Sequence, residues 1–430
     1  MNPLARAAIV AVGSELLTPS RIDTNSLYIT EQLNLLGIDV VIKAIVGDDR
    51  EELGHICRAA LSRVDLVVFS GGLGPTDDDL TREVVAGVLG RPLHEDEGIT
   101  ARMRARFAAR GYTMPMPEIN RRQAMVPEGA RVIENAHGSA PGLWLDDGPR
   151  VALLLPGPPR ELKPMLSALV AGPLRERTAG AALVRRVIKI AGRIESQTEE
   201  LLQPLYREWE TGTLPIAATI LAALGQIEVH LTARSTARDE AERVLEQAAR
   251  QVGDVVAPDA FSIDGRSMEE VVGEMLGSRG LRIAVAESCT GGLLASRLTD
   301  VPGSSRYVVQ AVVTYANEAK TDLLGVPPAM MAEHGAVSEP VALAMAAGVR
   351  NRARVDVGVG VTGIAGPGGG SPDKPVGTVA IAAVTGADAR SRLFRFNGGR
   401  DQVKFQASQA ALDMVRRMML ERDKQEAETD

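Results

Sequence analysis

Two short apolar runs in this chain end directly in glycine-rich loops, and each loop is followed by residues with helical spacing. The first run, Asp65–Phe69, leads into the loop 70–76, and the second, Leu281–Ala286, leads into the loop 287–292. A buried strand, a glycine loop and a helix form the repeating unit of a mostly parallel sheet covered by helices. The sequence therefore predicts two α/β units, and their different loop sequences indicate that they are not repeats.

The length of 430 residues allows about three domains at roughly 150 residues each. We expect an α/β unit over 1–171, a small α+β domain without a glycine loop over 172–258, and a second α/β unit over 266–420. The middle domain is expected to be structural. The charged tail 421–430 lacks apolar spacing, which predicts a frayed or disordered end.

Apolar periodicity and glycine or proline stops predict the main elements. The predicted strands are Ala7–Val12, Val40–Val46, Asp65–Phe69, Val151–Leu155, Arg185–Ala191, Gln226–Ala233, Leu281–Ala286 and Asp356–Val361. The predicted helices are Asn25–Leu36, Glu51–Ser62, Glu195–Trp209, Asp239–Val252 and Met268–Arg279.

Composition excludes several classes of protein. The 48 Lys and Arg against 55 Asp and Glu leave a net charge of −7, and only 3% of residues are aromatic, so direct nucleic-acid binding is not expected. Two cysteines allow neither a disulfide framework nor a cysteine zinc cluster. The chain shows neither a signal peptide nor an apolar run long enough to span a membrane, which predicts a cytoplasmic protein.

Three polar clusters follow predicted strands of the first unit. They are Gly13–Glu15 with Asp23–Asn25, the stretch Gly71–Glu83, and Pro156–Glu161. Ligands of open α/β sheets bind beyond the carboxyl ends of the strands, where glycine N–H groups can approach a phosphate. Neighbouring carboxylates can hold a hard cation such as Mg²⁺. The plainer interpretation is a tight turn followed by aspartates that cap a helix, and no Walker A lysine follows the glycines.

The second glycine loop places Ser288 at a strand-to-helix turn, which suits a nucleophile. Helix N–H groups behind it can stabilise an oxyanion. Lys320 is the candidate base if burial lowers its pKa, and Tyr315 can relay a proton or orient it. Thr362 and Gly363 begin a further glycine loop, and Arg400 is a candidate phosphate clamp.

Each of these residues also has a structural interpretation. Ser288 can cap the following helix, and Lys320 can be a surface charge. Cys289 can be a small core residue or a competing nucleophile. His334 is expected in a polar loop with a structural role.

The first unit resembles the N-terminal domain of the CinA (competence/damage-inducible protein A) family, which is similar to three-layer α/β molybdopterin-binding proteins of the MoaB/MogA type. The motifs that carry the resemblance are Gly13–Leu17, Asp23–Asn25, Gly71–Glu83, Asn120–Ala124, Gly138–Gly142 and Pro156–Pro159. The resemblance implies a metal-dependent pyrophosphatase acting on ADP-ribose, with Mg²⁺ or Co²⁺ and also K⁺. Implied ligand-binding residues are Asn25, Gly71, Gly72, Gly74 and Thr76, and implied metal-site residues are Asp23, Asp78, Asp79 and Glu83. Pro19-Ser20-Arg21 stands where the family often has glycine and an acidic residue.

The last unit resembles the C-terminal CinA domain, which is similar to nicotinamide mononucleotide (NMN) deamidases of the PncC type. The matching motifs are Ala286–Gly292, Thr314–Lys320, His334–Pro340, Thr362–Pro367 and Val376–Val379. The resemblance implies Ser288 as nucleophile, activated by Lys320 with Tyr315, and no cofactor. It implies a substrate site formed by Thr290, Gly291, Gly292, Thr362, Gly363 and Arg400. Gly399 replaces the family's usual acidic residue.

Together the resemblances imply a hydrolase of pyridine-nucleotide salvage that acts on NMN and ADP-ribose and forms a homodimer. Two other interpretations remain open from the sequence. The N-terminal domain can be a module that only binds a pterin or a nucleotide. The chain can also be an interaction protein linked to competence or recombination.

Overall fold

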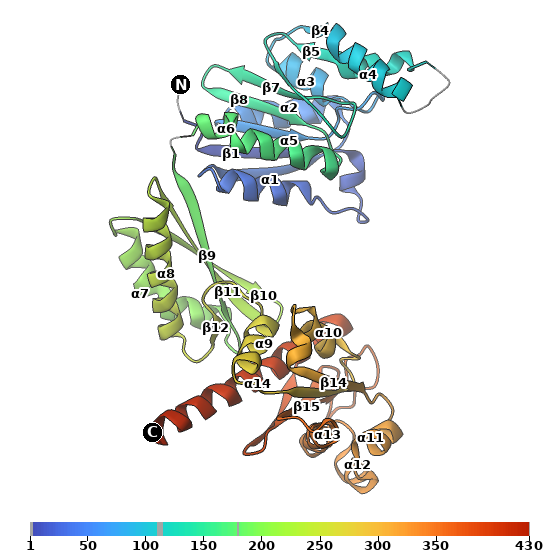
Figure 1. Cartoon of the computed structure of the whole chain (residues 1–430), viewed down its shortest axis with the longest axis vertical. Coiled ribbons are helices and arrows are strands. Elements are labelled where there is room, and N and C mark those ends of the chain that lie inside the picture. The colour runs from blue at the N-terminus through green and yellow to red at the C-terminus, as the bar shows by residue number, and fades with distance from the viewer. Residues whose placement is uncertain (1–2, 110–114, 179, 430) are drawn as a thin grey trace. The chain divides into compact units, whose positions relative to one another are not determined.

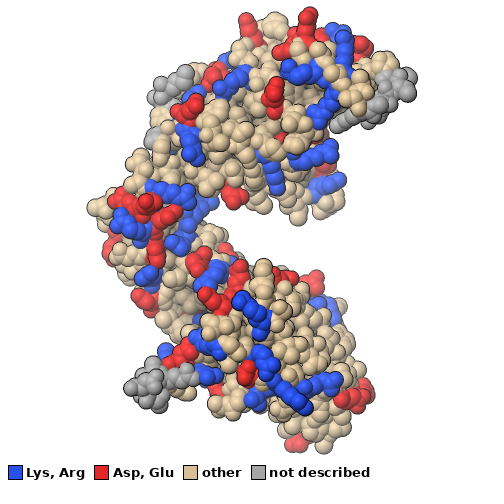
Figure 2. Space-filling view, in the orientation of Figure 1, with Lys and Arg blue, Asp and Glu red and all other residues tan. Residues whose placement is uncertain are grey.

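The computed structural model describes residues 3–109, 115–178 and 180–429 (Figure 1). The chain divides into two compact units, residues 1–184 with 233–243 and residues 185–232 with 244–430. The segment 172–258 is therefore shared between the two units. Basic and acidic side chains are interspersed on the face shown in Figure 2, in keeping with the small net charge. Among the described helices, none has the length and apolar character required to cross a bilayer.

The N-terminal unit contains a six-stranded sheet in the order β2-β1-β3-β8-β7-β6. The first four strands of that order are parallel, and β7 and β6 are antiparallel to their neighbours. The strands are β1 Arg6–Val12, β2 Asp39–Val46, β3 Leu66–Ser70, β6 Arg131–Ile133, β7 Gly142–Asp147 and β8 Arg150–Leu155, with a separate pair β4 Leu93–Glu95 and β5 Met125–Pro127. The helices are α1 Asn25–Asn34, α2 Arg50–Leu61, α3 Thr81–Val88, α4 Glu97–Ala109, α5 Pro159–Ala171 and α6 Pro173–Glu176, with 3-10 turns η1 Ser14–Leu17 and η2 Glu118–Ala124.

Helices cover both faces of this sheet because successive strand residues point to opposite sides. Ile9 of β1 packs in one cluster with Ile29 of α1 and Leu162 of α5. Its neighbour Val10 packs in the other cluster with Leu53 of α2 and with α3. These clusters form the predicted three-layer α/β arrangement.

The central parallel strands end level with one another. Ala11 of β1 pairs with Ser70 of β3, which pairs with Leu155 of β8. Gly13, Gly71 and the loop after Leu155 therefore lie at one edge, as predicted for a ligand site in an open α/β sheet.

A four-stranded sheet in the order β10-β11-β9-β12 belongs mostly to the second unit. Its elements are β9 Ala182–Ile190, α7 Glu195–Glu210, β10 Ile216–Ala223, β11 Gln226–Ser235, α8 Arg238–Val255 and β12 Ala260–Ser262. The sequence analysis missed β10 and β12. The strand β10 has small residues and an exposed end, and β12 is only three residues long, so neither shows strong apolar alternation.

The C-terminal sheet has the order β14-β13-β15-β16-β17, with β13, β14 and β15 parallel and β16 and β17 antiparallel. The strands are β13 Ile283–Glu287, β14 Val308–Val313, β15 Val357–Gly363, β16 Thr378–Val384 and β17 Ala389–Arg395. The helices are α9 Met268–Ser278, α10 Leu293–Asp300, α11 Asn317–Leu324, α12 Pro328–His334, α13 Glu339–Ala353 and α14 Arg400–Thr429, with the 3-10 turn η3 Ser304–Arg306.

This sheet is also covered on both faces. Residues of α9, α10 and α14 pack on one face, and residues of α11 and α13 pack on the other. Two glycines of β15 allow α13 to approach closely. A Cβ atom at Gly358 would lie 2.2 Å from the carbonyl oxygen of Ala346, and one at Gly360 would lie 2.3 Å from that of Ala342.

Two sequence predictions are wrong. The tail 421–429 continues α14 instead of being frayed or disordered, while Asp430 lies outside the described residues. Ion pairs replace the missing apolar contacts: Glu421 accepts from Arg390 at 2.9 Å, and Asp423 accepts from Arg279 at 3.1 Å. His334 is the last residue of α12 and does not lie in a loop.

Candidate functional site

Ser288 follows β13 at the point where two neighbouring strands also end. Its N–H donates to the carbonyl oxygen of Val361 in β15 (2.9 Å), and the N–H of Thr314, which follows β14, donates to the carbonyl oxygen of Glu287 (2.7 Å). Gly291 and Gly292 have φ values of +60° and +94°, a conformation that favours glycine. These bonds place the Ser288 side chain between the ends of β14 and β15.

Lys320 of α11 reaches Ser288 from the neighbouring segment. Its Nζ lies 3.3 Å from Ser288 Oγ and donates to the carbonyl oxygens of Thr314 (2.9 Å) and Tyr315 (3.4 Å). The side chain is buried, and desolvation lowers the pKa of Lys320, which favours the neutral amine that a base requires. The surface-charge interpretation of Lys320 is wrong.

Tyr315 accepts a hydrogen bond from Lys320 through its main-chain carbonyl group. Its exposed side chain carries a hydroxyl that accepts from Arg400 Nη2 at 2.8 Å, and Arg400 Nη1 donates to the carbonyl oxygen of Gly366 at 2.6 Å. The structure therefore pairs the Tyr315 hydroxyl with the candidate phosphate clamp and not with the candidate base.

Sequence reasoning missed Lys404, which lies one helical turn after Arg400 in α14. A Cβ atom at Gly291 would lie 3.7 Å from its Nζ, so this cation stands beside the Ser288 loop. The sequence pattern that could have indicated Lys404 is its spacing of four residues from Arg400, at the start of a helix that follows Gly398-Gly399.

The other predicted substrate residues divide into two groups. Thr290 is buried in the Ser288 loop, and its hydroxyl oxygen has no hydrogen-bond partner in the described chain. The Thr362 hydroxyl, in contrast, donates to the carbonyl oxygen of Ala336 at 2.8 Å. A Cβ atom at Gly363 would lie 2.7 Å from a Val379 side-chain carbon, which ties this glycine to the pairing of β15 with β16.

The residues on either side of Ser288 have distinct environments. Cys289 packs in the hydrophobic core, and burial raises the pKa of its thiol to about 12, which disfavours the thiolate that a competing nucleophile needs. The Glu287 carboxylate is fully buried and accepts the N–H groups of Gly292, Leu294 and Ala295. Glu287, rather than Ser288, therefore caps α10.

A second candidate site lies at the glycine loop of the N-terminal unit. Gly71 and Gly72 have positive φ, and a Cβ atom at Gly71 would lie 2.2 Å from the carbonyl oxygen of Val12. Asn25 Nδ2 donates to Ser70 Oγ (3.1 Å) and to the carbonyl oxygen of Gly157 (2.7 Å), which joins the start of α1 to the end of β3 and to the loop after β8. The loops after β1, β3 and β8 line a cavity of about 370 Å³.

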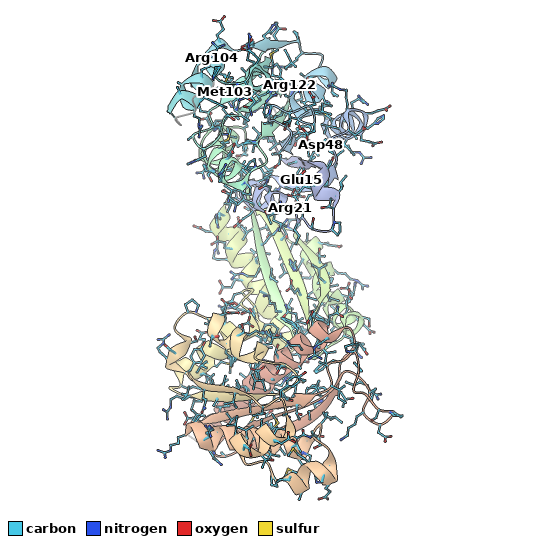
Figure 3. All side chains as sticks on the ribbon, turned by 90° about the vertical axis from the view of Figure 1, so that its right-hand side faces the viewer. Glu15, Arg21, Asp48, Met103, Arg104 and Arg122 are labelled. Atoms are coloured by element: carbon cyan, nitrogen blue, oxygen red, sulfur yellow. The ribbon has the colours of Figure 1, made fainter. Side chains whose placement is uncertain are left out.

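Acidic side chains line this cavity from several elements. They are Glu15, Asp48, Asp78, Asp79 and Glu161. Glu15 and Asp48, which Figure 3 labels, lie on the same side of the N-terminal unit.

The four predicted metal-site residues do not form one metal site. Both Asp79 oxygens accept loop donors: Oδ1 accepts from the N–H of Gly74 (2.8 Å) and Oδ2 from the N–H of Thr76 (2.9 Å). Asp23 accepts from the N–H of Ser26 at 3.0 Å. Asp78 is exposed, and a hydrogen bond from Thr76 lowers its pKa. No group of three His, Cys, Asp or Glu side chains in the described ranges is arranged to hold a metal ion.

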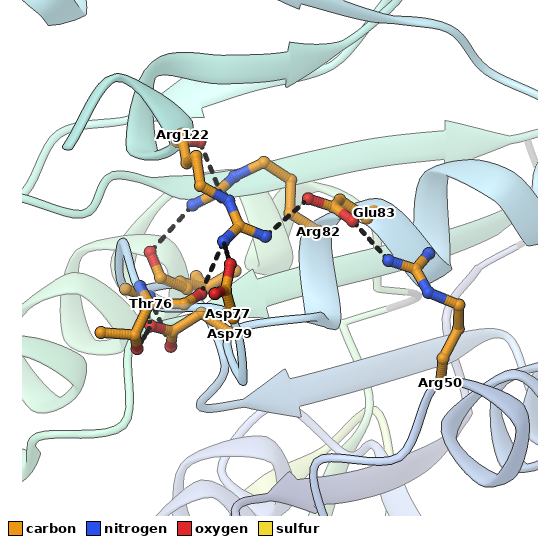
Figure 4. A network of polar contacts seen from close by, with 9 residues as sticks. Arg50, Thr76, Asp77, Asp79, Arg82, Glu83 and Arg122 are labelled. Atoms are coloured by element: carbon orange, nitrogen blue, oxygen red, sulfur yellow. Dashed lines mark hydrogen bonds and ion pairs between the residues drawn. The ribbon is translucent and has the colours of Figure 1, made fainter. Parts of the chain in front are cut away.

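Glu83 instead belongs to an arginine network shown in Figure 4. Its carboxylate pairs with Arg50 (2.6 Å) and Arg122 (3.1 Å), and hydrogen bonds from these two residues lower its pKa. The buried Arg82 donates to the carbonyl oxygens of Leu73 and Arg122, both at 2.9 Å. Of the predicted metal-site residues, Asp79 thus stabilises the glycine loop, and Glu83 pairs with the arginines beside it.

Removing the Asp79 carboxylate should destabilise the N-terminal unit. Asp79→Ala leaves the N–H groups of Gly74 and Thr76 without their acceptor, which we expect to cost about 1–3 kcal/mol. Asp77→Ala is the matched control on the same turn, because it removes only a surface ion pair with Arg122 and should cost less than about 1 kcal/mol. Urea unfolding of the N-terminal unit measures both, and equal losses would contradict this role of Asp79.

Comparisons with known proteins agree with the architecture. Residues 265–419 match the family described as CinA C-terminal domain, and residues 8–176 match the family described as probable molybdopterin binding domain. A CinA-like protein of Koribacter versatilis is 47% identical over 420 residues, which cover 96% of this chain and 100% of that protein. A CinA-like protein of Acidobacterium capsulatum is 46% identical over 418 residues, with 96% and 100% covered.

Solved structures match single parts of the chain. The crystal structure of the competence/damage inducible protein CihA from Agrobacterium tumefaciens is 40% identical, covers 35% of this chain and 94% of its own, and has a TM-score of 0.34. The full-length relatives and the two domain matches together show that the chain belongs to the CinA family.

Proposed function

We propose that the C-terminal domain hydrolyses the carboxamide of nicotinamide mononucleotide to the carboxylic acid and ammonia. The observation that carries this proposal is the 3.3 Å contact between Lys320 Nζ and Ser288 Oγ, both on buried residues. A serine next to a desolvated lysine is an established nucleophile–base pair for acyl transfer.

The reaction then has two acyl-transfer steps. Ser288 Oγ attacks the carboxamide carbon while its proton passes to neutral Lys320, and the carbonyl electron pair moves to the oxygen. The tetrahedral intermediate expels ammonia, which takes the proton back from Lys320. Water attacks the resulting ester through the same base, releases the carboxylic acid and restores the Ser288 hydroxyl.

The substrate's phosphate is proposed to bind Arg400 and Lys404. Lys404 stands beside the Ser288 loop, and Arg400, one turn earlier on α14, binds the Tyr315 hydroxyl; charge-assisted hydrogen bonds from such groups suit a phosphate. Their binding of the phosphate would hold the pyridinium carboxamide at the serine.

For the N-terminal unit we propose hydrolysis of the diphosphate of ADP-ribose. The supporting observation is a phosphate-type glycine loop that borders a cavity lined by five carboxylates, into which an anion enters only together with cations. Formation of AMP and ribose 5-phosphate with Mg²⁺ or Co²⁺, with and without K⁺, tests this proposal. Binding of ADP-ribose without product would instead support a binding module.

Replacing the nucleophile should abolish ammonia release from NMN. Ser288→Ala removes the attacking oxygen, so we expect a loss of at least about 10³-fold in kcat. Cys289→Ala is the matched control, because its thiol is buried and stays protonated, and it should retain most activity. Equal activity of parent and Ser288→Ala would place the nucleophile elsewhere.

The rate should increase with pH through the pKa of Lys320. The base must be neutral, and burial lowers its pKa, so the active form appears at a lower pH than for an exposed lysine and is lost as the pH falls. A pH profile of kcat/KM for NMN measures this limb, and Lys320→Arg should be inactive throughout. A profile that falls with increasing pH across the same range would contradict Lys320 as the base.

Lys404→Ala should weaken binding of the phosphorylated substrate. We expect KM for NMN to increase about tenfold to a hundredfold with little change in kcat, because one charge-assisted contact is lost. Hydrolysis of the nucleoside without phosphate should be unaffected, and Lys424→Ala, near the end of the same helix, is the control. An equal effect on both substrates would show that Lys404 does not bind the phosphate.

A further inference from the structure

The backbone N–H groups around Ser288 are almost all engaged within the protein. Ser288 donates to Val361, Gly291 to the Ser288 carbonyl oxygen (3.1 Å), and Leu293 to the Thr290 carbonyl oxygen (3.3 Å). The N–H groups of Gly292, Leu294 and Ala295 donate to the Glu287 carboxylate at 2.9–3.1 Å. The start of α10 is therefore satisfied from inside the domain.

Two consecutive N–H groups are the exception within this fully described loop. Those of Cys289 and Thr290 have no acceptor on another of the described residues, although Cys289 is 5% exposed and Thr290 is fully buried. Buried N–H groups are nearly always paired, so two adjacent unpaired ones next to a nucleophile require an explanation. In serine hydrolases with a strand-to-helix nucleophile, the N–H of the following residue binds the oxyanion.

Glu287 holds the loop in the conformation that leaves the N–H groups of Cys289 and Thr290 unpaired. Its carboxylate is fully buried, and three N–H donors at the positive end of α10 compensate its charge. The same contacts occupy the helix N–H groups that the sequence analysis assigned to the oxyanion. The Thr290 hydroxyl is also buried in this loop, and it has no hydrogen-bond partner among the described residues.

We propose that the N–H groups of Cys289 and Thr290 form the oxyanion hole, and that Glu287 is the positioning residue that holds them by binding the start of α10. This inference rests on the proposed deamidase function. When the Ser288 Oγ–carbon bond forms and the carbonyl electron pair moves to oxygen, these two donors bind the negative charge, and they release it when ammonia leaves. Glu287 acts through the N–H groups of Gly292, Leu294 and Ala295 that its carboxylate binds.

The test compares NMN with its thiocarboxamide analogue in the parent and in Glu287→Gln. Sulfur accepts N–H hydrogen bonds poorly, so a working oxyanion hole gives the parent a high ratio of oxygen to sulfur rates. Glu287→Gln keeps the shape but replaces one acceptor oxygen with an NH₂ group. We expect kcat for NMN to fall about tenfold to a hundredfold with KM nearly unchanged, and the rate ratio to fall with it.

Arg297→Gln is the matched control. Arg297 anchors α10 elsewhere, through Ser408 (2.7 Å) and Glu269 (2.7 Å), and touches none of the loop N–H groups. A purely structural effect lowers both rates equally and leaves the ratio unchanged, as we expect for Arg297→Gln. The same unchanged ratio in Glu287→Gln would overturn its positioning role. If Glu287→Gln does not fold, the parent alone still tests the oxyanion hole. An oxygen-to-sulfur rate ratio in the parent equal to that of uncatalysed hydrolysis would show that these N–H groups do not bind the oxyanion.

A second readout separates this inference from the deamidase proposal. A fluorophosphonate labels Ser288 by forming an Oγ–P bond and releasing fluoride, while the serine proton passes to Lys320 and the P=O oxygen takes the place of the oxyanion. Labelling slowed at least tenfold by Glu287→Gln but not by Arg297→Gln supports the inference even if NMN is not hydrolysed. Equal labelling rates in parent and Glu287→Gln would overturn it even if NMN is hydrolysed.

Discussion

The candidate chemistry of the C-terminal domain depends on the burial of one amine against one hydroxyl. Lys320 reaches Ser288 because β13 and β14 are parallel neighbours, so that the segments following them lie together at one edge of the sheet. Carbonyl oxygens of Thr314 and Tyr315 hold the amine in place, and the surrounding protein removes it from water. Burial lowers the pKa of Lys320 and raises that of Cys289, so it favours a neutral amine at Lys320 and a protonated thiol at Cys289.

The two glycine loops are held by carboxylates in a similar way. Asp79 accepts N–H groups of the N-terminal loop, and Glu287 accepts N–H groups that follow the C-terminal loop. Asp79, which the resemblance implied as a metal-site residue, thus satisfies backbone donors, and Glu287 does the same at the start of α10. Glycines then allow close backbone approach, as at Gly71 beside Val12.

The two candidate sites differ in where their Arg and Lys side chains lie. In the C-terminal domain Lys404 stands beside the Ser288 loop, and the Tyr315 hydroxyl and the Gly366 carbonyl group position Arg400. In the N-terminal unit Arg50 and Arg122 neutralise Glu83, and other acids face the cavity. The C-terminal site thus presents cations beside the Ser288 loop, whereas the N-terminal cavity presents carboxylates.

The sequence by itself determined that two α/β units are present, which strands end in glycine loops, and that Ser288 stands at a strand-to-helix turn, because apolar periodicity and loop glycines are local properties. The apolar alternation of the sequence was too weak to predict β10 and β12. The lack of apolar spacing after residue 420 led to a wrong prediction for the end of α14, because ion pairs with Arg279 and Arg390 support this part of the helix. Only the tertiary structure decided that Lys320 is buried, that Tyr315 faces Arg400, and that Asp79 and Glu83 are already engaged. Those outcomes depend on which partners distant segments bring to a side chain, and local residue patterns do not contain that information.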